Sequence, residues 1–162
     1  VSKVYDNGSV ALDDVCLTIN DGEFVLVCGH SGAGKSTLFK LLTHEVVPDA
    51  GTVIVDDFDV TRMKRSKIPK LRRKLGVVFQ DFRLLPNKTV AENIAFALEV
   101  IEEKPKIIKE KVSHVLDLVG LSEKANDLPE DLSGGEQQRV AIARAIVNRP
   151  TVLISAPLIL SL

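Results

Sequence analysis

The 162-residue sequence has no tryptophan, one tyrosine and one methionine, and aromatic residues make up only 4% of it. Two cysteines, Cys16 and Cys28, are too few for the disulfide framework of a small secreted domain. Both lie among apolar residues, so we expect them to be buried, reduced thiols. No apolar stretch approaches the 18 residues of a membrane-spanning helix, since the longest, residues 151–162, is interrupted by Pro157.

The sequence also lacks an excess of positive charge. It has 21 Lys and Arg against 22 Asp and Glu, which excludes a generally basic nucleic-acid-binding protein. A hydrophobic fraction of 45% excludes a disordered chain and indicates one soluble globular domain. No secretory signal peptide opens the sequence, so a cytosolic location is expected. The first residue is Val1 rather than Met, which suggests a fragment or a trimmed chain.

One segment departs from this charge balance. The stretch from Arg62 to Lys74 holds eight basic residues and no acidic one, and the rest of the chain carries a net charge of -9. Two interpretations stay open: a solvated helix face, or a patch for an anionic neighbour such as lipid headgroups or an acidic partner loop. The basic residues are Arg62, Lys64, Arg65, Lys67, Lys70, Arg72, Arg73 and Lys74.

The order of apolar and turn-forming segments predicts an α/β core with a helical insertion of roughly fifty residues. The runs Phe24–Cys28 and Gly76–Gln80 are continuously apolar up to their last residues, as buried strands are. Further strands are predicted at Val1–Tyr5, Ala11–Ile19, Thr52–Val55 and Thr151–Ile154. Helices are predicted at Lys35–Thr43, Ser66–Lys74, Thr89–Val100, Lys106–Val119 and Ser133–Asn148.

A glycine-rich loop follows the first buried strand. Residues Gly29-His30-Ser31-Gly32-Ala33-Gly34-Lys35-Ser36 match G-x-x-x-x-G-K-[ST] and open a predicted helix, the context this motif requires. Glycines let backbone N–H groups converge on phosphate oxygens, and the helix dipole adds positive charge. Lys35 would reach the β- and γ-phosphates, and the Ser36 hydroxyl would bind Mg²⁺. His30, His44 and His114 show no ligand spacing, so no zinc site is predicted.

A second glycine motif stands before a later helix. Within Leu132–Arg139, Ser133 and Glu136 have the spacing of a capping box, and this purely structural reading stays open. Gly134 and Gly135 also leave N–H groups at the helix N-terminus accessible to an anion. With the loop upstream, the chain has two helix ends suited to phosphate.

The two motifs together resemble those of ABC-type ATPases. Gly29–Thr37 is similar to their Walker A loop and Leu132–Arg139 to their signature motif, while Gln80 and Tyr5 stand where the family has its Q-loop glutamine and adenine-stacking aromatic. The resemblance implies a P-loop NTPase (RecA-like) core with an antiparallel β subdomain and a helical subdomain. It divides the single domain into residues 1–80 (core with β subdomain), 81–135 (helical) and 136–162 (return to the core).

Longer stretches resemble the cell-division subfamily of ATP-binding subunits, FtsE, particularly its Gram-positive forms. They are Gly29–Leu38, Leu71–Pro86, Thr89–Val90, Glu92–Asn93 and Ala143–Asn148. Lipoprotein-releasing and macrolide-export ATPases and amino-acid importers share the core motifs and stay open as alternatives. For an FtsE-like chain, the resemblance implies a peripheral location at the cytoplasmic side of the membrane and the membrane subunit FtsX as a partner. It implies no nucleic-acid partner.

In this family two ATP-binding domains pack head to tail with ATP between them. The resemblance therefore implies a homodimer in which Ser133, Gly134, Gly135 and Gln137 contact ATP bound by the partner chain. Lys35 and Gln80 would be catalytic, and Ser36 and Gln80 would bind Mg²⁺. Phe82, Leu84, Leu85 and Phe96 could form a docking groove for the membrane subunit or belong to the core of the helical part. The resemblance also implies ATP-binding residues in the N-terminal part of the chain, which are Tyr5, Gly29, Ser31, Gly32, Ala33, Gly34, Lys35, Ser36 and Thr37.

The sequence departs from the family after the strand Thr151–Ile154. Ala156 and Pro157 occupy the positions of the Walker B aspartate and the glutamate that polarises the attacking water. The D-loop, the switch histidine and the last core strands are also missing, as in a domain truncated at this strand. We therefore expect weak nucleotide binding and little hydrolysis, since loss of a positioned acid–base group costs about 10²–10⁴-fold. A frameshifted gene, a fragment and a natural short form stay open, and the abrupt loss of pattern favours an artefact of the gene sequence.

Other P-loop proteins fit less well. A soluble DNA-repair ATPase would carry a long coiled coil between the two glycine motifs, and no heptad run lies there. A GTPase or kinase would lack the Ser133–Arg139 motif. A non-hydrolysing nucleotide-binding module stays open beside the ATPase.

Overall fold

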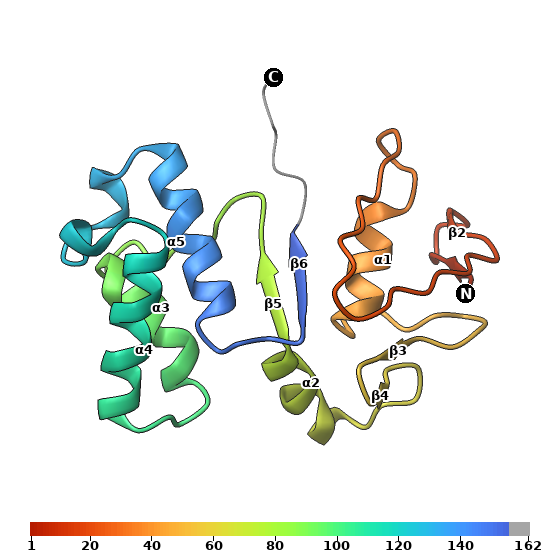
Figure 1. Ribbon diagram of the computed structural model, residues 1–162. Helices are drawn as coiled ribbons and strands as arrows, with labels where there is room; N and C mark the ends of the chain where they lie inside the picture. Colours follow the sequence, from red (N-terminus) through yellow and green to blue (C-terminus); the bar gives the residue numbers. More distant parts are fainter. Residues whose placement is uncertain (156–162) are drawn as a thin grey trace. The chain divides into compact units, whose positions relative to one another are not determined.

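The computed structural model describes residues 1–155, and these form two compact units (Figure 1). The first unit is Val1–Arg72, and the second begins at Arg73. Within the described part of the chain, none of the helices has the length and apolar character needed to cross a membrane. The division into subdomains at residues 80 and 135 stays a prediction.

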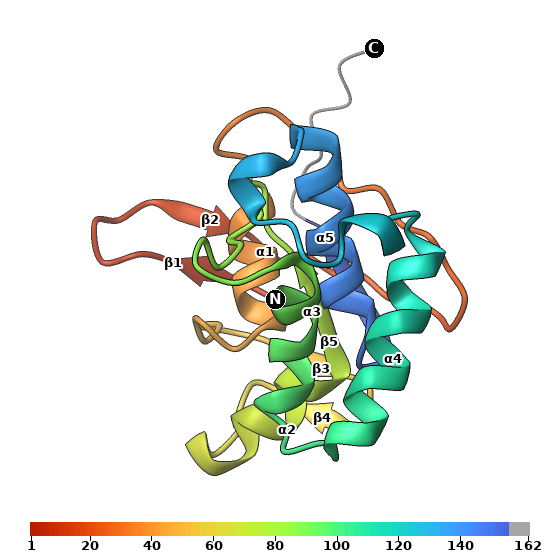
Figure 2. The same ribbon diagram turned by 90° about the vertical axis from the view of Figure 1, so that its left-hand side faces the viewer.

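The first unit begins with an antiparallel pair of strands. β1 (Lys3–Val4) pairs with β2 (Val10–Leu12) around a turn in which Gly8 donates its N–H to the Tyr5 carbonyl at 2.8 Å. Both strands were predicted but are shorter than expected, and the register shifts between Lys3 and Val4. Figure 2 shows the pair and its connecting loop from the side.

The rest of the first unit is built around one helix and a second strand pair. α1 (Lys35–Leu42) confirms the predicted helix, and β3 (Ile54–Val55) pairs with β4 (Phe58–Asp59), a strand that the sequence did not predict. A short 3₁₀ turn, η1 (Arg65–Lys67), leads into α2 (Ile68–Lys74), in agreement with the predicted basic helix. The buried apolar side chains of the unit are Leu12, Leu41, Val53, Val55, Val60 and Leu71.

The predicted buried strand at Phe24–Cys28 is wrong for this structure. The segment forms no strand, and Phe24 and Leu26 are 92% and 75% exposed. A parallel strand is stable only with hydrogen-bonded neighbours and covered faces, and no strand among residues 1–155 pairs with this segment. Cys16 and Cys28 are exposed as well, which corrects the prediction that both thiols are buried.

The second unit holds a parallel strand pair. β5 (Leu75–Val78) lies beside β6 (Val152–Ser155), with Leu75 opposite Val152 and Val78 opposite Ser155. Both strands were predicted within a few residues. Gly76 lies where a Cβ atom would come within 2.6 Å of the Ala145 carbonyl oxygen, so only glycine allows the last turns of α5 this close to the strand.

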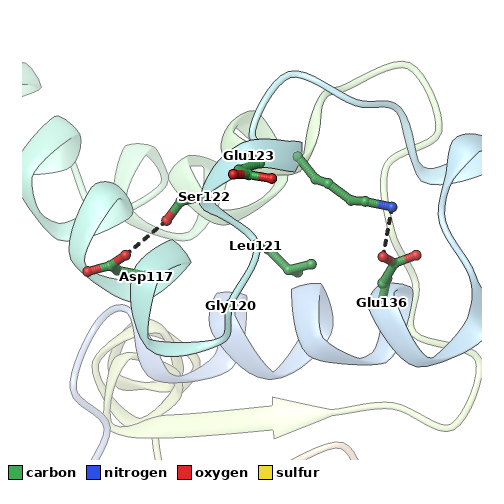
Figure 3. A pocket seen from close by; sticks show the side chains of 7 residues that line it. Asp117, Gly120, Leu121, Ser122, Glu123 and Glu136 are labelled. Carbon is green, nitrogen blue, oxygen red and sulfur yellow. Dashed lines mark hydrogen bonds and ion pairs between the residues drawn. The ribbon is translucent and has the colours of Figure 1, made fainter.

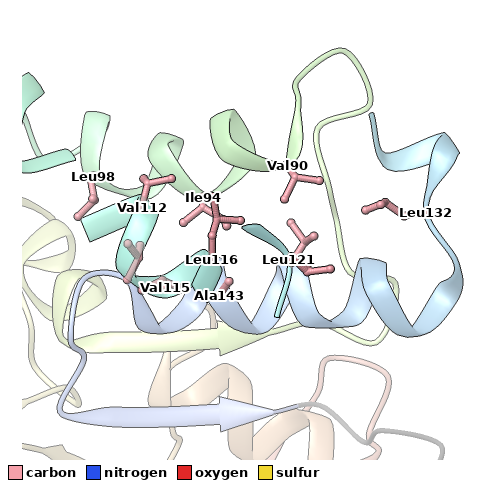
Figure 4. Close-up of a cluster of buried hydrophobic side chains, with 11 residues drawn as sticks. Val90, Ile94, Leu98, Val112, Val115, Leu116, Leu121, Leu132 and Ala143 are labelled. Carbon is pink, nitrogen blue, oxygen red and sulfur yellow. The ribbon is translucent and has the colours of Figure 1, made fainter. Parts of the chain in front are cut away.

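Three helices form the apolar core of this unit (Figure 4). They are α3 (Val90–Glu99), α4 (Pro105–Leu118) and α5 (Gly134–Ile146), which confirm the three predicted helices, with the short turns η2 (Ser122–Lys124) and η3 (Pro129–Asp131) between α4 and α5. Thr89 caps α3 through a capping box with Glu92. The core residues are Val90, Ile94, Leu98, Val112, Val115, Leu116, Leu121, Leu132, Val140, Ala143 and Val147.

The candidates for a docking groove divide between core and surface. Leu84 packs against the apolar core, as expected if it belongs to the core of the helical part. Phe96 on α3 remains 40% exposed, so it does not belong to the core. Phe82 and Leu85 are half-buried.

Asn93 is the only buried side chain on α3 that is polar, and it is fully inaccessible. Its amide nitrogen donates to the carbonyls of Leu85, Lys88 and Thr89 at 3.1, 2.9 and 3.0 Å, and its oxygen accepts the Leu85 N–H at 2.7 Å. A buried amide with every polar atom paired holds a loop firmly. Asn93 therefore fixes the path of residues 85–89 into α3.

We expect Asn93→Ala to lower the free energy of unfolding by roughly 2–4 kcal/mol, because it leaves the Leu85 N–H without its acceptor and takes one donor from the carbonyls of Leu85, Lys88 and Thr89. Urea denaturation followed by circular dichroism measures this change. Asn148→Ala is the matched control, since Asn148 makes one exposed amide bond, to the Arg73 carbonyl at 2.9 Å. Equal destabilisation by the two variants would contradict this role for Asn93.

Candidate nucleotide-binding site

The glycine-rich loop of the first unit has the backbone shape that phosphate binding needs. Gly32 and Gly34 both have φ of +83°, a conformation that residues with a side chain rarely adopt. At Gly34, the residue before α1, a Cβ atom would also lie 2.1 Å from the Ala11 carbonyl oxygen. Glycine at this position is therefore required both by backbone conformation and by the close approach of β2.

The first turn of α1 presents unpaired donors. The N–H groups of Lys35, Ser36 and Thr37 donate to no acceptor among residues 1–155, and the first helical bond of this turn runs from the Leu38 N–H to the Gly34 carbonyl at 2.9 Å. The helix dipole concentrates positive charge at the same place. These groups can bind the oxygens of a phosphate.

Lys35 turns back over its own loop. Its ammonium donates to the carbonyls of Gly29 and His30 at 2.5 and 2.8 Å, so the positive charge lies above the loop. The Ser36 hydroxyl is exposed and makes no hydrogen bond within the described residues. The remaining predicted loop residues, Ser31 and Ala33, are exposed in the same turn.

Tyr5 lies beside the end of this loop. Its hydroxyl is 3.2 Å from the hydroxyl of Thr37, the buried third residue of α1, and the Lys3 ammonium lies 5.9 Å from the centre of its ring. The first unit thus brings Tyr5 and Thr37 together, although they are far apart in the sequence. The predicted stacking of Tyr5 on adenine stays a prediction.

The second glycine motif is a capped helix N-terminus in the second unit. Ser133 precedes α5, and its N–H and hydroxyl donate to Glu136 Oε2 at 2.8 and 2.7 Å, while the Glu136 N–H donates back to the Ser133 hydroxyl at 3.4 Å. This confirms the predicted capping box. A Cβ atom at Gly134 or Gly135 would meet nothing within 4 Å, so both glycines face open space.

Glu136 joins this cap to a second element. Its Oε1 accepts from the Lys124 ammonium of η2 at 2.7 Å (Figure 3). A guanidinium nitrogen of Arg139 lies 4.0 Å from the same oxygen. The Lys124 ammonium, followed by the hydroxyl and N–H of Ser133, lowers the pKa of Glu136 to about 2. A cavity of about 290 Å³ lies alongside, lined by Asp117, Gly120, Leu121, Ser122, Glu123, Lys124 and Glu136.

Gln137 faces its own chain. Its amide nitrogen donates to the carbonyls of Pro129 and Leu132 at 2.9 and 3.3 Å and so ties η3 to α5. The resemblance implied a contact with ATP for this residue, and that role stays a prediction. Its observed role is to hold the loop before Ser133.

Gln80 follows β5 and is exposed. The backbone just after it is held by a side chain of α5. Phe82 and Arg83 both have positive φ, and the Arg144 guanidinium on α5 donates to their carbonyls at 2.6 and 2.7 Å. Burial lowers the pKa of Arg144. Nothing in the sequence indicates this role for Arg144, because a contact across 61 positions leaves no local signal.

The comparisons with known proteins agree with this geometry. The model of the ABC transporter family matches residues 12–155. The chain belongs to the ABC transporter family. The cell division ATP-binding protein FtsE of Bacillus subtilis is 56% identical over 155 residues, which cover 96% of this chain and 68% of the relative. The methionine import ATP-binding protein MetN of Helicobacter hepaticus is 44% identical over 95% of this chain and 44% of the relative.

A solved ABC structure supports the same assignment. The ATP-binding cassette MJ0796, in a dimeric post-hydrolysis state bound to ADP and Pi, matches with a TM-score of 0.82 and 36% identity. The match covers 96% of this chain and 70% of that one. This agrees with the predicted α/β ATPase core, with its small antiparallel sheets and its helical part.

We expect the carboxyl group of Glu136 to titrate near pH 2, and Lys124→Ala to move its midpoint up toward 4.5. Because the pKa is lowered on folding, this group stabilises the fold above pH 4.5 and loses that contribution as the pH falls toward 2. NMR titration of the side-chain carboxyl measures the midpoint. Glu123→Ala in the same cavity is the control, and an unchanged Glu136 midpoint in Lys124→Ala would contradict the assignment.

Proposed function

We propose that this chain is the ATP-binding subunit of an ABC-type membrane complex with an FtsE-like role in cell division. The observation that carries the proposal is the loop of residues 29–36, with two glycines at positive φ opening onto the unpaired N–H groups of α1. Membership of the ABC transporter family and the identity with FtsE support it.

ATP binding then uses groups already present in the first unit. The N–H groups of Lys35, Ser36 and Thr37 donate to the β-phosphate, and the Lys35 ammonium exchanges the loop carbonyls for phosphate oxygens. The exchange needs only a side-chain rotation, because Lys35 is held by two carbonyls of its own loop and by no acid among the described residues. Tyr5, which lies beside Thr37, offers a ring face for the base.

The chain offers oxygen donors for Mg²⁺. The Ser36 hydroxyl is exposed and unbonded within residues 1–155, and a hydroxyl suits a hard cation. In the same range no three His, Cys, Asp or Glu side chains gather around a metal position, so the phosphates would complete the shell. Mg²⁺, when bound, neutralises charge on the transferred phosphoryl group. The assignment of Gln80 as a second ligand stays a prediction.

The signature motif is proposed to act on nucleotide held by a second copy of the chain. Gly134 and Gly135 face open space at the N-terminus of α5, where N–H groups and the helix dipole favour an anion. Ser133 is held by Glu136, which leaves the glycine N–H groups as the accessible donors. A head-to-tail homodimer, with MJ0796 as a dimeric precedent, would supply the nucleotide.

The membrane partner is proposed to be FtsX-like, with the chain peripheral at the cytoplasmic face. Greater identity to FtsE than to MetN over nearly the same residues favours this over amino-acid import. Export or lipoprotein release, and a nucleotide-binding module that does not hydrolyse, are the alternatives. Phe96, exposed on α3, is a candidate contact with the partner.

Hydrolysis by this chain is proposed to be very slow. Ala156 and Pro157 lie outside the described residues, and neither side chain can hold a metal-bound water or accept a proton. The family reaction needs a carboxylate at each position, and the loss of such a group costs about 10²–10⁴-fold.

We expect Lys35→Ala to weaken ATP binding at least tenfold, because it removes the only side-chain cation of the loop. Isothermal titration calorimetry with Mg-ATP measures the dissociation constant. Lys40→Ala on the exposed side of α1 is the control and should bind as the unaltered chain does. Equal affinity in the Lys35 and Lys40 variants would overturn the proposed site.

We expect phosphate release from Mg-ATP to be near background for the unaltered chain and at least tenfold faster after Ala156→Asp with Pro157→Glu. Readily measurable ATPase activity in the unaltered chain that disappears in Lys35→Ala would show that the expected loss of hydrolysis is wrong.

A further inference from the structure

The basic segment Arg62–Arg72 has no role in the proposed nucleotide site. Its six basic residues are exposed, and none forms an ion pair with an acid of the described residues. The rest of the first unit has three basic residues against ten acidic ones, so positive charge is concentrated in this segment. We name the six the basic surface: Arg62, Lys64, Arg65, Lys67, Lys70 and Arg72.

The local fold keeps these charges directed outward. η1 and α2 make residues 65–74 helical, with Leu71 fully buried and Ile68 half-buried on the inner side. Apolar side chains anchor this helical segment to the protein, and the basic ones cover the remaining circumference. No acid lies within the segment to neutralise them.

We propose that the basic surface binds the anionic phosphates of a lipid bilayer. A dense array of headgroup phosphates needs only several presented cations, each of which adds about 1 kcal/mol near the membrane. Because the apolar side of α2 is buried in the protein, the contact is electrostatic and involves no insertion. Its strength therefore falls with salt.

The segment suits a nucleic acid less well. Residues 62–74 contain no aromatic side chain on which a base could stack, and α2 spans only seven residues. The chain as a whole has a net charge of -1, without the general excess of positive charge of nucleic-acid-binding proteins. A bilayer also agrees with a chain that works beside a membrane subunit, although the lipid contact does not depend on that function.

Vesicle sedimentation tests the proposal with the full chain. Vesicles of 30% phosphatidylglycerol in phosphatidylcholine should bind the protein in low salt, and pure phosphatidylcholine should not. Lys64→Gln with Arg65→Gln and Lys67→Gln should lower the partition coefficient at least tenfold. Lys104→Gln with Lys106→Gln and Lys109→Gln removes the same charge from exposed positions at the start of α4 and should change it less than twofold.

Three outcomes would overturn the proposal. Equal loss in the two triple variants would mean that only net charge matters, and no sedimentation with anionic vesicles would mean that lipid is not bound. If the protein bound duplex DNA at a lower concentration than it bound the anionic vesicles, the surface would be assigned to nucleic acid. Inorganic phosphate should displace no more protein than sodium chloride of equal ionic strength. If the first triple variant loses its circular dichroism spectrum, Lys70→Gln with Arg72→Gln replaces it, with at least a fivefold loss expected.

Discussion

The first N–H groups of an α-helix have no acceptor inside the helix, and this constraint dominates both glycine motifs of the chain. At α1 the donors of Lys35, Ser36 and Thr37 are left unpaired, and glycines at positive φ give the loop its shape in front of them. At α5 the same need is met from within, since Ser133 and Glu136 cap the helix. The N-terminus of α1 thus has unpaired donors, while that of α5 is capped from within and leaves Gly134 and Gly135 exposed.

The position of α5 determines most of the second unit. Its buried side contributes Val140, Ala143 and Val147 to the apolar core, and its last turns lie against β5 at Gly76. From the same helix Arg144 holds the backbone after Gln80. The signature glycines at the start of α5 and the backbone after Gln80 are therefore both held by this one helix.

Charged side chains are distributed unevenly, and paired and unpaired charges lie in different parts of the chain. Glu136 is shared between Ser133 and Lys124, so a carboxylate stiffens the signature end of α5. The basic surface of the first unit is by contrast unpaired and exposed, as a surface for an external anion must be. The Lys35 ammonium is hydrogen-bonded to two carbonyls of its own loop.

Residue patterns are sufficient to predict the elements whose signals are local. The glycine loop before α1, the capping box at Ser133 and the three helices of the second unit follow from residue spacing, because caps and helical periodicity act over a few residues. Features that depend on residues far apart in the sequence follow only from the folded structure. Phe24–Cys28 reads as a buried strand yet has no partner strand among the described residues, and so it is exposed. Arg144 gains its role only from carbonyls that folding brings to it, and a contact across 62 positions leaves no trace in local spacing.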